Sequence, residues 1–119
     1  MIYIVDIDHT ICDTPLIDGA HCYTQCTPYP ERIKMVNELY DSGHTIIYWT
    51  ARGSSSGINW TDLTTQQLKD WGCKFHEVRL KKPSYDIWID DKAINDADFF
   101  AKTKIIRPRN SDVKESRTY

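Results

Sequence analysis

The chain opens on a short apolar run that ends in two carboxylates, and this arrangement constrains the fold more than any other segment. Residues 1–5 are β-branched or aromatic apart from the initial Met, which predicts a buried β-strand. Asp6 and Asp8 follow, one residue apart. Alternation along a strand points both side chains to the same side, so their charges repel unless a cation lies between them. Mg²⁺ prefers oxygen ligands of this kind. If Asp6 and Asp8 were the only such signal in the sequence, they would indicate no more than solvated turn residues after a strand.

The rest of the chain alternates predicted strands with predicted helices. The patterns predict strands at residues 1–5, 44–49, 75–80, 86–89 and 104–106, and helices at 30–41, 59–71 and 94–102. Residues 11–28 predict a long loop or short hairpin over the sheet edge, and residues 107–119 a polar tail. This order is typical of a single three-layer α/β domain with a mostly parallel sheet over residues 1–106. Such folds bind ligands at the carboxyl ends of their strands.

The length and net charge of the chain limit the kinds of binding partner to expect. A chain of 119 residues with a net charge of −2 gives no support to a nucleic-acid or membrane partner. No apolar segment approaches the roughly 20 residues of a membrane-spanning helix. The N-terminus lacks the basic region of a signal peptide and enters a predicted strand at once. We therefore expect a cytoplasmic protein with a small-molecule ligand.

The four cysteines leave two interpretations open. Cys22 and Cys26, with His21, could form a zinc site, but no regular second pair of ligands follows. Reduced thiols in a loop beside the functional site are therefore favoured. Cys12 and Cys73 are predicted to be packing residues.

Four segments, in order along the chain, resemble the haloacid dehalogenase superfamily of aspartyl phosphatases. They are Asp6-Ile7-Asp8-His9-Thr10, the apolar strand 46–49 with Thr50, Lys82 before Pro83, and the apolar strand 87–89 with Asp90 and Asp91. The resemblance covers residues 1–106 and implies a Rossmann-like core. The gaps that hold a cap domain in many members hold none here, so it implies a capless member. Water exclusion would then come from the 11–28 loop, a large substrate or a second copy of the chain in a homo-oligomer.

The resemblance implies a Mg²⁺-dependent phosphomonoester hydrolase. Asp6 would be the nucleophile and form an aspartyl-phosphate. The side chain of Asp8 would be the general acid for the leaving alcohol and then the base for water. Asp6, the backbone carbonyl of Asp8 and a carboxylate of Asp90 or Asp91 would hold the metal. Asp90 is favoured for the direct bond.

The remaining site residues would contact the substrate. Thr50 would offer a hydroxyl to the phosphoryl oxygens, although it could merely cap a loop. Lys82 would offer a cation to the same oxygens and restrain Asp6, and the Lys-Pro order favours it over Lys81. The other candidate substrate-binding residues are Thr10, His9 and Arg52.

Two of these residues carry open alternatives. Arg52 could clamp a phosphate or a substrate carboxylate, or form a surface salt bridge. His9 could touch the leaving group or only fill space. The four tryptophans, Trp60 among them, are predicted to be core residues rather than a base-stacking platform, since they lie at apolar positions of the predicted elements.

The substrate is the least constrained feature. Residues 44–53 further resemble small phosphatases of bacterial capsule and surface-polysaccharide synthesis, which implies a phosphorylated sugar, sugar acid or polyol. The alternatives are a polynucleotide 3′-phosphatase or a nucleotidase, and, from another class, a receiver-like signalling domain that becomes phosphorylated. The acidic charge opposes a polynucleotide substrate. The spacing of Asp6 and Asp8 opposes the receiver.

Overall fold

The computed structural model describes residues 1–101, and the chain divides into two compact units after Ser84. The first unit contains β1 Ile2–Val5, β2 Cys12–Asp13, β3 Leu16–Ile17, β4 Ala20–His21, the 3₁₀ turn η1 Tyr23–Gln25, β5 Thr27–Pro28, α1 Pro30–Asp41, β6 Thr45–Trp49, α2 Thr61–Asp70 and β7 Glu77–Arg79. The described helix of the second unit is α3 Asp96–Phe100. The single domain predicted over residues 1–106 stays a prediction.

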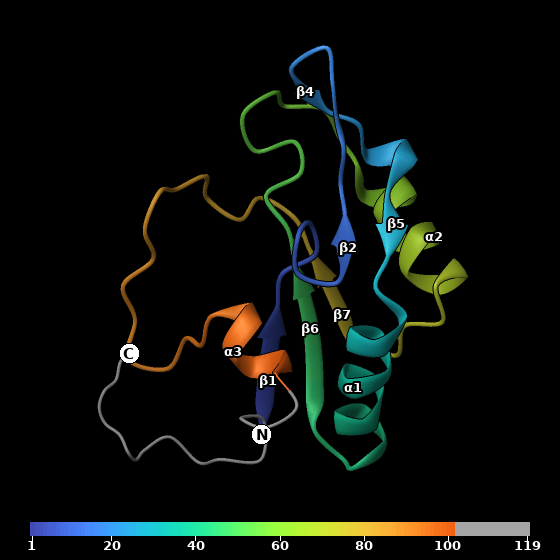
Figure 1. Cartoon of the computed structure of the whole chain (residues 1–119), viewed down its shortest axis with the longest axis vertical. Coiled ribbons are helices and arrows are strands. Elements are labelled where there is room, and N and C mark those ends of the chain that lie inside the picture. Colours follow the sequence, from blue (N-terminus) through green and yellow to red (C-terminus); the bar gives the residue numbers. More distant parts are fainter. Residues whose placement is uncertain (102–119) are drawn as a thin grey trace. The chain divides into compact units, whose positions relative to one another are not determined.

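A parallel three-stranded sheet organises the first unit (Figure 1). Its order is β1-β6-β7, and Ile4 lies opposite Ile47 and Tyr48 opposite Val78. The helix α1 connects β1 to β6, and α2 connects β6 to β7. Both crossovers run in the same direction across the sheet, so right-handed connections put both helices on one face. The predicted Rossmann-like α/β class with a parallel sheet is confirmed.

The core forms where the central strand meets α1. Ile46, Ile47 and Tyr48 of β6 are buried, because this strand has a hydrogen-bonded neighbour on each side. Ile33 and Val36 are the buried residues of α1, which packs on β6. Their spacing of three residues places them on one face of the helix. Burial of this apolar face is what fixes α1 against the sheet.

The first strand is less buried than its composition predicts. It lies at the edge of the described sheet, and its exposure alternates along the strand. Ile2 and Ile4 are exposed in the described chain, while Tyr3 and Val5 are half-buried. Composition predicts a strand here correctly, but it cannot say whether both faces are covered.

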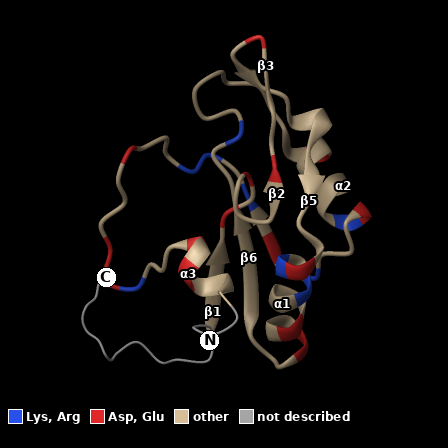
Figure 2. Cartoon of the chain, viewed as in Figure 1, with Lys and Arg blue, Asp and Glu red and all other residues tan. Residues whose placement is uncertain are grey.

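The two long helices begin and end close to the predicted residues. Pro30 is the first residue of α1, where its missing N–H is not needed, and Gly43, with a φ of +96°, follows the helix. The exposed residues of α1 include charges of both signs, as Figure 2 shows. The helix α2 begins at Thr61, whose backbone N–H donates to Asn59 Oδ1 at 3.0 Å. No helix among residues 1–101 has the length and apolar character needed to cross a bilayer.

Residues 11–28 form two short antiparallel ladders, which confirms the short hairpin. β2 pairs with β5, and β3 pairs with β4. The chain reverses at Asp18 and Gly19, whose φ values are +53° and +80°. Two left-handed residues make the tight turn that matches the twist of a hairpin. Figure 1 shows β4 and its turn beyond the carboxyl end of β1.

The second unit departs from the sequence prediction. The predicted strand at residues 86–89 is wrong, because these residues pair with no strand in the described chain, and Ile89 is 93% exposed. An apolar run becomes a strand only where a neighbour accepts its backbone hydrogen bonds. The predicted helix is present but shorter, as α3, and Asn95 caps it by accepting from Ala97 N at 2.9 Å. The predicted strand at 104–106 and the polar tail lie outside the described residues.

Candidate active site

The chain turns immediately after β1 and so holds the two acidic residues at the carboxyl end of the sheet. The carbonyl of Ile7 accepts from the N–H groups of Thr10 and Ile11, at 3.1 and 2.9 Å. Ile7 itself is fully buried, which anchors the turn. His9 has a φ of +64°, the left-handed conformation that reverses the chain beside Asp8.

Asp6 lies between a hydroxyl and an ammonium group. Thr10 Oγ1 donates to Asp6 Oδ2 at 3.2 Å, and Lys82 Nζ lies 3.5 Å from Asp6 Oδ1. Burial is the main influence on the pKa of Asp6 and raises it above its ordinary value, while Lys82 is the largest opposing influence. The Asp6 side chain nevertheless remains 35% exposed, so its carboxylate is open to a ligand.

Asp8 has very different surroundings. Arg52 donates to it through Nε, at 3.0 Å to Oδ2, and through a terminal nitrogen, at 2.9 Å to Oδ1. Thr14 Oγ1 also donates to Asp8 Oδ1. Burial alone would raise the pKa of Asp8, but the hydrogen bonds and charge of Arg52, with the bond from Thr14, hold this pKa below its ordinary value. Asp8 is therefore an ionised carboxylate at neutral pH.

Arg52 is only 2% exposed and its partner Asp8 is half-buried, so the ion pair between them is not the surface salt bridge of the sequence alternative. Its other terminal nitrogen donates to Thr64 Oγ1 at 3.1 Å and to Gln67 Oε1 at 2.6 Å, both on α2. A guanidinium with partners on all sides is fixed in place. The predicted contact of Arg52 with a substrate anion stays a prediction, because in the structure the Arg52 guanidinium binds Asp8.

Thr50 and Lys82 meet at the carboxyl end of β6. The Lys82 N–H donates to the Thr50 carbonyl at 3.0 Å, and this bond holds Lys82 where its ammonium reaches Asp6. The Thr50 hydroxyl accepts from the N–H of Arg52 at 3.1 Å, which is the loop-capping role that the sequence left open. Thr50 is almost completely buried. The structure thus brings Asp6, Thr10, Thr50 and Lys82 into one connected group.

Asp90 and Asp91 belong to the second unit, so their distance from Asp6 is not described. Asp90 Oδ1 accepts from the N–H of Lys92 at 2.9 Å, and this bond is the main cause that lowers the pKa of Asp90. Asp91 Oδ2 lies 3.8 Å from Lys92 Nζ. Both carboxylates are exposed. Their role as metal ligands stays a prediction.

Two thiols approach Asp8, and the sequence did not predict this. The donor atoms of Asp8, Cys12 and Cys26 lie within 4.8 Å of one another. This group differs from the Cys22, Cys26 and His21 set considered above, and all four cysteines are free thiols. Burial raises the pKa of Cys12 to about 12, so its thiol is neutral at physiological pH. Spacing could not reveal the group because β2 and β5 bring its cysteines together.

Four rings form a connected row beside this acidic group. They belong to His9, His21, Tyr23 and Trp60, and each contacts the next. Tyr23 also lies over the guanidinium of Arg52, 4.8 Å from its central carbon to the ring centroid. Sequence reasoning missed Tyr23 and assigned Trp60 to the core, although Trp60 is only half-buried. Tyr23 lies in η1 and Trp60 directly precedes α2, so their contact depends on how these two segments pack, which local sequence does not specify.

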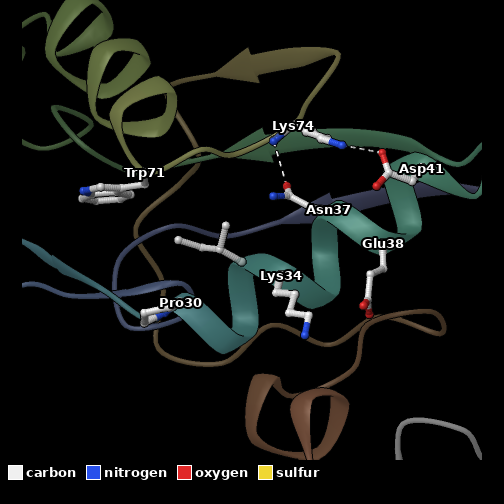
Figure 3. A pocket seen from close by; sticks show the side chains of 8 residues that line it. Pro30, Lys34, Asn37, Glu38, Asp41, Trp71 and Lys74 are labelled. Atoms are coloured by element: carbon white, nitrogen blue, oxygen red, sulfur yellow. Dashed lines mark hydrogen bonds and ion pairs between the residues drawn. The ribbon is translucent and has the colours of Figure 1, made fainter.

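Two open recesses lie outside this group. One follows α1, where Asn37 and the ion pair of Lys74 with Asp41 line it (Figure 3). The other lies between the loop after Arg52 and Ser84, and Lys81 is one of its residues. Neither recess is lined by Asp6 or Asp8. The two recesses are therefore not part of the candidate site, which is the acidic group at the end of β1.

Comparison with known proteins supports the fold and offers one functional lead. A crystal structure of a target protein from Vibrio cholerae superposes with a TM-score of 0.70 at 23% identity, over 84% of this chain and 87% of that chain. At this identity the likeness shows the α/β fold alone. No protein-family profile matches the chain.

A curated protein of Bacillus cereus, named "Putative nucleotidase", is 35% identical over 65 residues. The match covers 55% of this chain and 32% of that protein. The chain thus spans about a third of the length of this relative. The name "Putative nucleotidase" belongs to that longer protein.

Proposed function

We propose that the chain is a Mg²⁺-dependent phosphomonoester hydrolase of the haloacid dehalogenase type, with Asp6 as its nucleophile. The observation that carries the proposal is the setting of Asp6. Its carboxylate lies at the end of β1, 3.5 Å from the ammonium of Lys82 and partly open to solvent, with a second carboxylate two residues on. Phosphate monoesters are doubly charged, so their hydrolysis needs a nucleophile, neutralisation of charge and a proton donor.

The residues on hand fit a hard divalent cation. Asp6 has an open carboxylate oxygen and Asp8 a backbone carbonyl, and oxygen ligands of this kind suit Mg²⁺. Asp90 or Asp91 would complete the ligand set. When bound, the cation would screen the negative charges of nucleophile and phosphate.

In the first half-reaction, Asp6 attacks phosphorus and the leaving alcohol departs with a proton. Lys82 restrains the Asp6 carboxylate and neutralises charge on the phosphoryl oxygens. In the second half-reaction, water attacks the phosphorylated Asp6. Asp8, held ionised by Arg52, is suited to accept the proton of that water. To act as the acid in the first step, Asp8 must gain a proton against the influence of Arg52.

The substrate class has two candidates. The sequence resemblance favours a phosphorylated sugar, sugar acid or polyol. A nucleotide is the second candidate, because the Bacillus cereus relative is named as a nucleotidase and because rings lie beside the acidic group. A polynucleotide 3′-phosphatase and a receiver-like domain remain the weaker alternatives.

A phosphate-release screen tests the proposal. The full chain is incubated with phosphorylated sugars, sugar acids, polyols and nucleotides, with Mg²⁺ or with EDTA, beside Asp6→Asn prepared identically. We expect release that requires both Mg²⁺ and Asp6. Release that persists after thorough chelation or in Asp6→Asn would contradict the mechanism. One phosphate bound per chain without turnover would support the receiver alternative.

A further inference from the structure

The four rings beside the acidic group form a continuous row. His9 follows Asp8 directly in the chain, and its ring centroid lies 5.9 Å from that of His21. The rings of His21 and Tyr23 are nearly parallel, with an angle of 6° and centroids 6.2 Å apart. Trp60 meets Tyr23 edge to face at 5.1 Å. We call these four residues the ring row.

The Tyr23 ring, third in the row, is held by the residues that bind Asp8. Arg52, which binds Asp8, lies under the Tyr23 ring at 4.8 Å, the distance of a cation–π contact. Gln67 joins the same assembly, because its Oε1 accepts from Arg52 and its Nε2 donates to the Tyr23 carbonyl. The position of the Tyr23 ring is thus coupled to that of the Asp8 carboxylate.

The first two rings of the row are open to solvent. His9 and His21 are exposed, whereas Tyr23 and Trp60 are half-buried. None of the four is among the buried residues that form the core of the described chain. Core packing therefore does not account for the row, and a ligand can reach the exposed rings of His9 and His21.

We infer that the ring row binds the base of a nucleoside monophosphate whose phosphate lies at Asp6. This inference rests on the proposed function and selects its second substrate class. A planar base gains stacking on rings of this kind, whereas a polyol or an open-chain sugar acid has no aromatic face to offer. Stacking tolerates any base, so we expect hydrolysis of both purine and pyrimidine nucleotides.

Substrate competition tests the ring row. The ratio of kcat/KM for adenosine 5′-monophosphate to that for ribose 5-phosphate is measured for the wild type, His21→Ala, His21→Phe and Leu16→Ala. Leu16 is the matched control, because it pairs with His21 across the hairpin and is 65% exposed but belongs to no ring contact of the row. We expect the ratio to fall about five-fold or more in His21→Ala, the loss typical of a stacked base, and to recover in His21→Phe. Leu16→Ala should keep the wild-type ratio.

A binding measurement separates failure of this inference from failure of the proposed function. Adenosine 5′-monophosphate and ribose 5-phosphate are titrated into the full chain, and the ring protons of His21 and Tyr23 are followed by NMR. We expect upfield shifts with the nucleotide alone. If no substrate is hydrolysed, the proposed function fails, and the NMR titration still shows whether the ring row binds a base. If both substrates are hydrolysed but neither the ratio nor the ring protons respond, the ring row is overturned and the phosphatase stands.

Discussion

Asp6 and Asp8 stand two residues apart, yet the structure gives their carboxylates opposite surroundings. Asp6 faces a single ammonium at 3.5 Å, and burial raises its pKa. Asp8 accepts several hydrogen bonds from a buried guanidinium, and its pKa is lowered. A carboxylate with few fixed partners is free to form a new bond, whereas one held by Arg52 keeps its position. Under the proposed mechanism, these different surroundings let two identical side chains divide the reaction, with bond formation at Asp6 and proton movement at Asp8.

The largest expected effect comes from removing the nucleophile. In Asp6→Asn the amide is nearly isosteric but cannot attack phosphorus, so phosphate release should fall to background. The fold should persist, since the change also removes one charge from a repelling pair. Phosphate release and far-UV circular dichroism check both points. Substantial turnover in a preparation free of contaminating phosphatase would contradict the role of Asp6 as the nucleophile.

The second effect concerns Asp8. We expect Asp8→Asn to slow turnover by roughly 10²–10⁴-fold, the range typical of general acid–base groups. Its metal contact is proposed through the backbone carbonyl, so Mg²⁺ binding should survive, as isothermal titration can show. A wild-type rate in this variant would reduce Asp8 to a structural partner of Arg52.

A smaller loss is expected at Lys82. Removing one group that stabilises developing charge costs about 10²–10³-fold in kcat, so we expect Lys82→Ala to fall in this range. Lys81→Asn is the matched control, because Lys81 is exposed and its φ of +66° suits Asn. Steady-state kinetics on both variants compare the neighbours. Equal losses would mean that the loop, rather than the ammonium beside Asp6, matters.

The smallest effect is on the pH dependence of stability. The folded pKa of Asp8 is lowered, so its contribution to the free energy of unfolding is present above the unfolded pKa and is lost as pH falls through the folded pKa. The folded pKa of Asp6 is raised, so its contribution has the opposite sign. In EDTA, Asp8→Asn should therefore flatten the acid loss of stability and Asp6→Asn should steepen it.

Denaturant unfolding between neutral pH and about pH 3 measures this difference. Parallel pH profiles for the two variants would show that the two carboxylates share one environment.

Local patterns predicted those features of the molecule that depend on local sequence. The apolar period of residues 30–41 gave α1, which buries one face, and the apolar run of residues 44–49 gave β6, which buries three consecutive residues. Asp6 and Asp8 closely follow one predicted strand and Lys82 follows another, so the sequence alone could place all three at strand ends. The partner of Asp8 could not be predicted, since 44 residues separate it from Arg52 and the contact depends on where α2 and the hairpin pack. The strand at 86–89 failed because composition does not supply a pairing neighbour.

The central claim, that Asp6 takes the phosphoryl group while Asp8 moves the proton, is tested most directly by trapping. Asp8→Asn is mixed with an aryl phosphate and Mg²⁺ and quenched in acid, and its peptides are mapped by mass spectrometry. A good leaving group needs little protonation, so the first step should proceed while the second is slow. The account predicts one phosphoryl group on Asp6, absent when Asp6→Asn is added to the same variant. An unmodified chain that still releases phosphate, or modification of another residue, would contradict it.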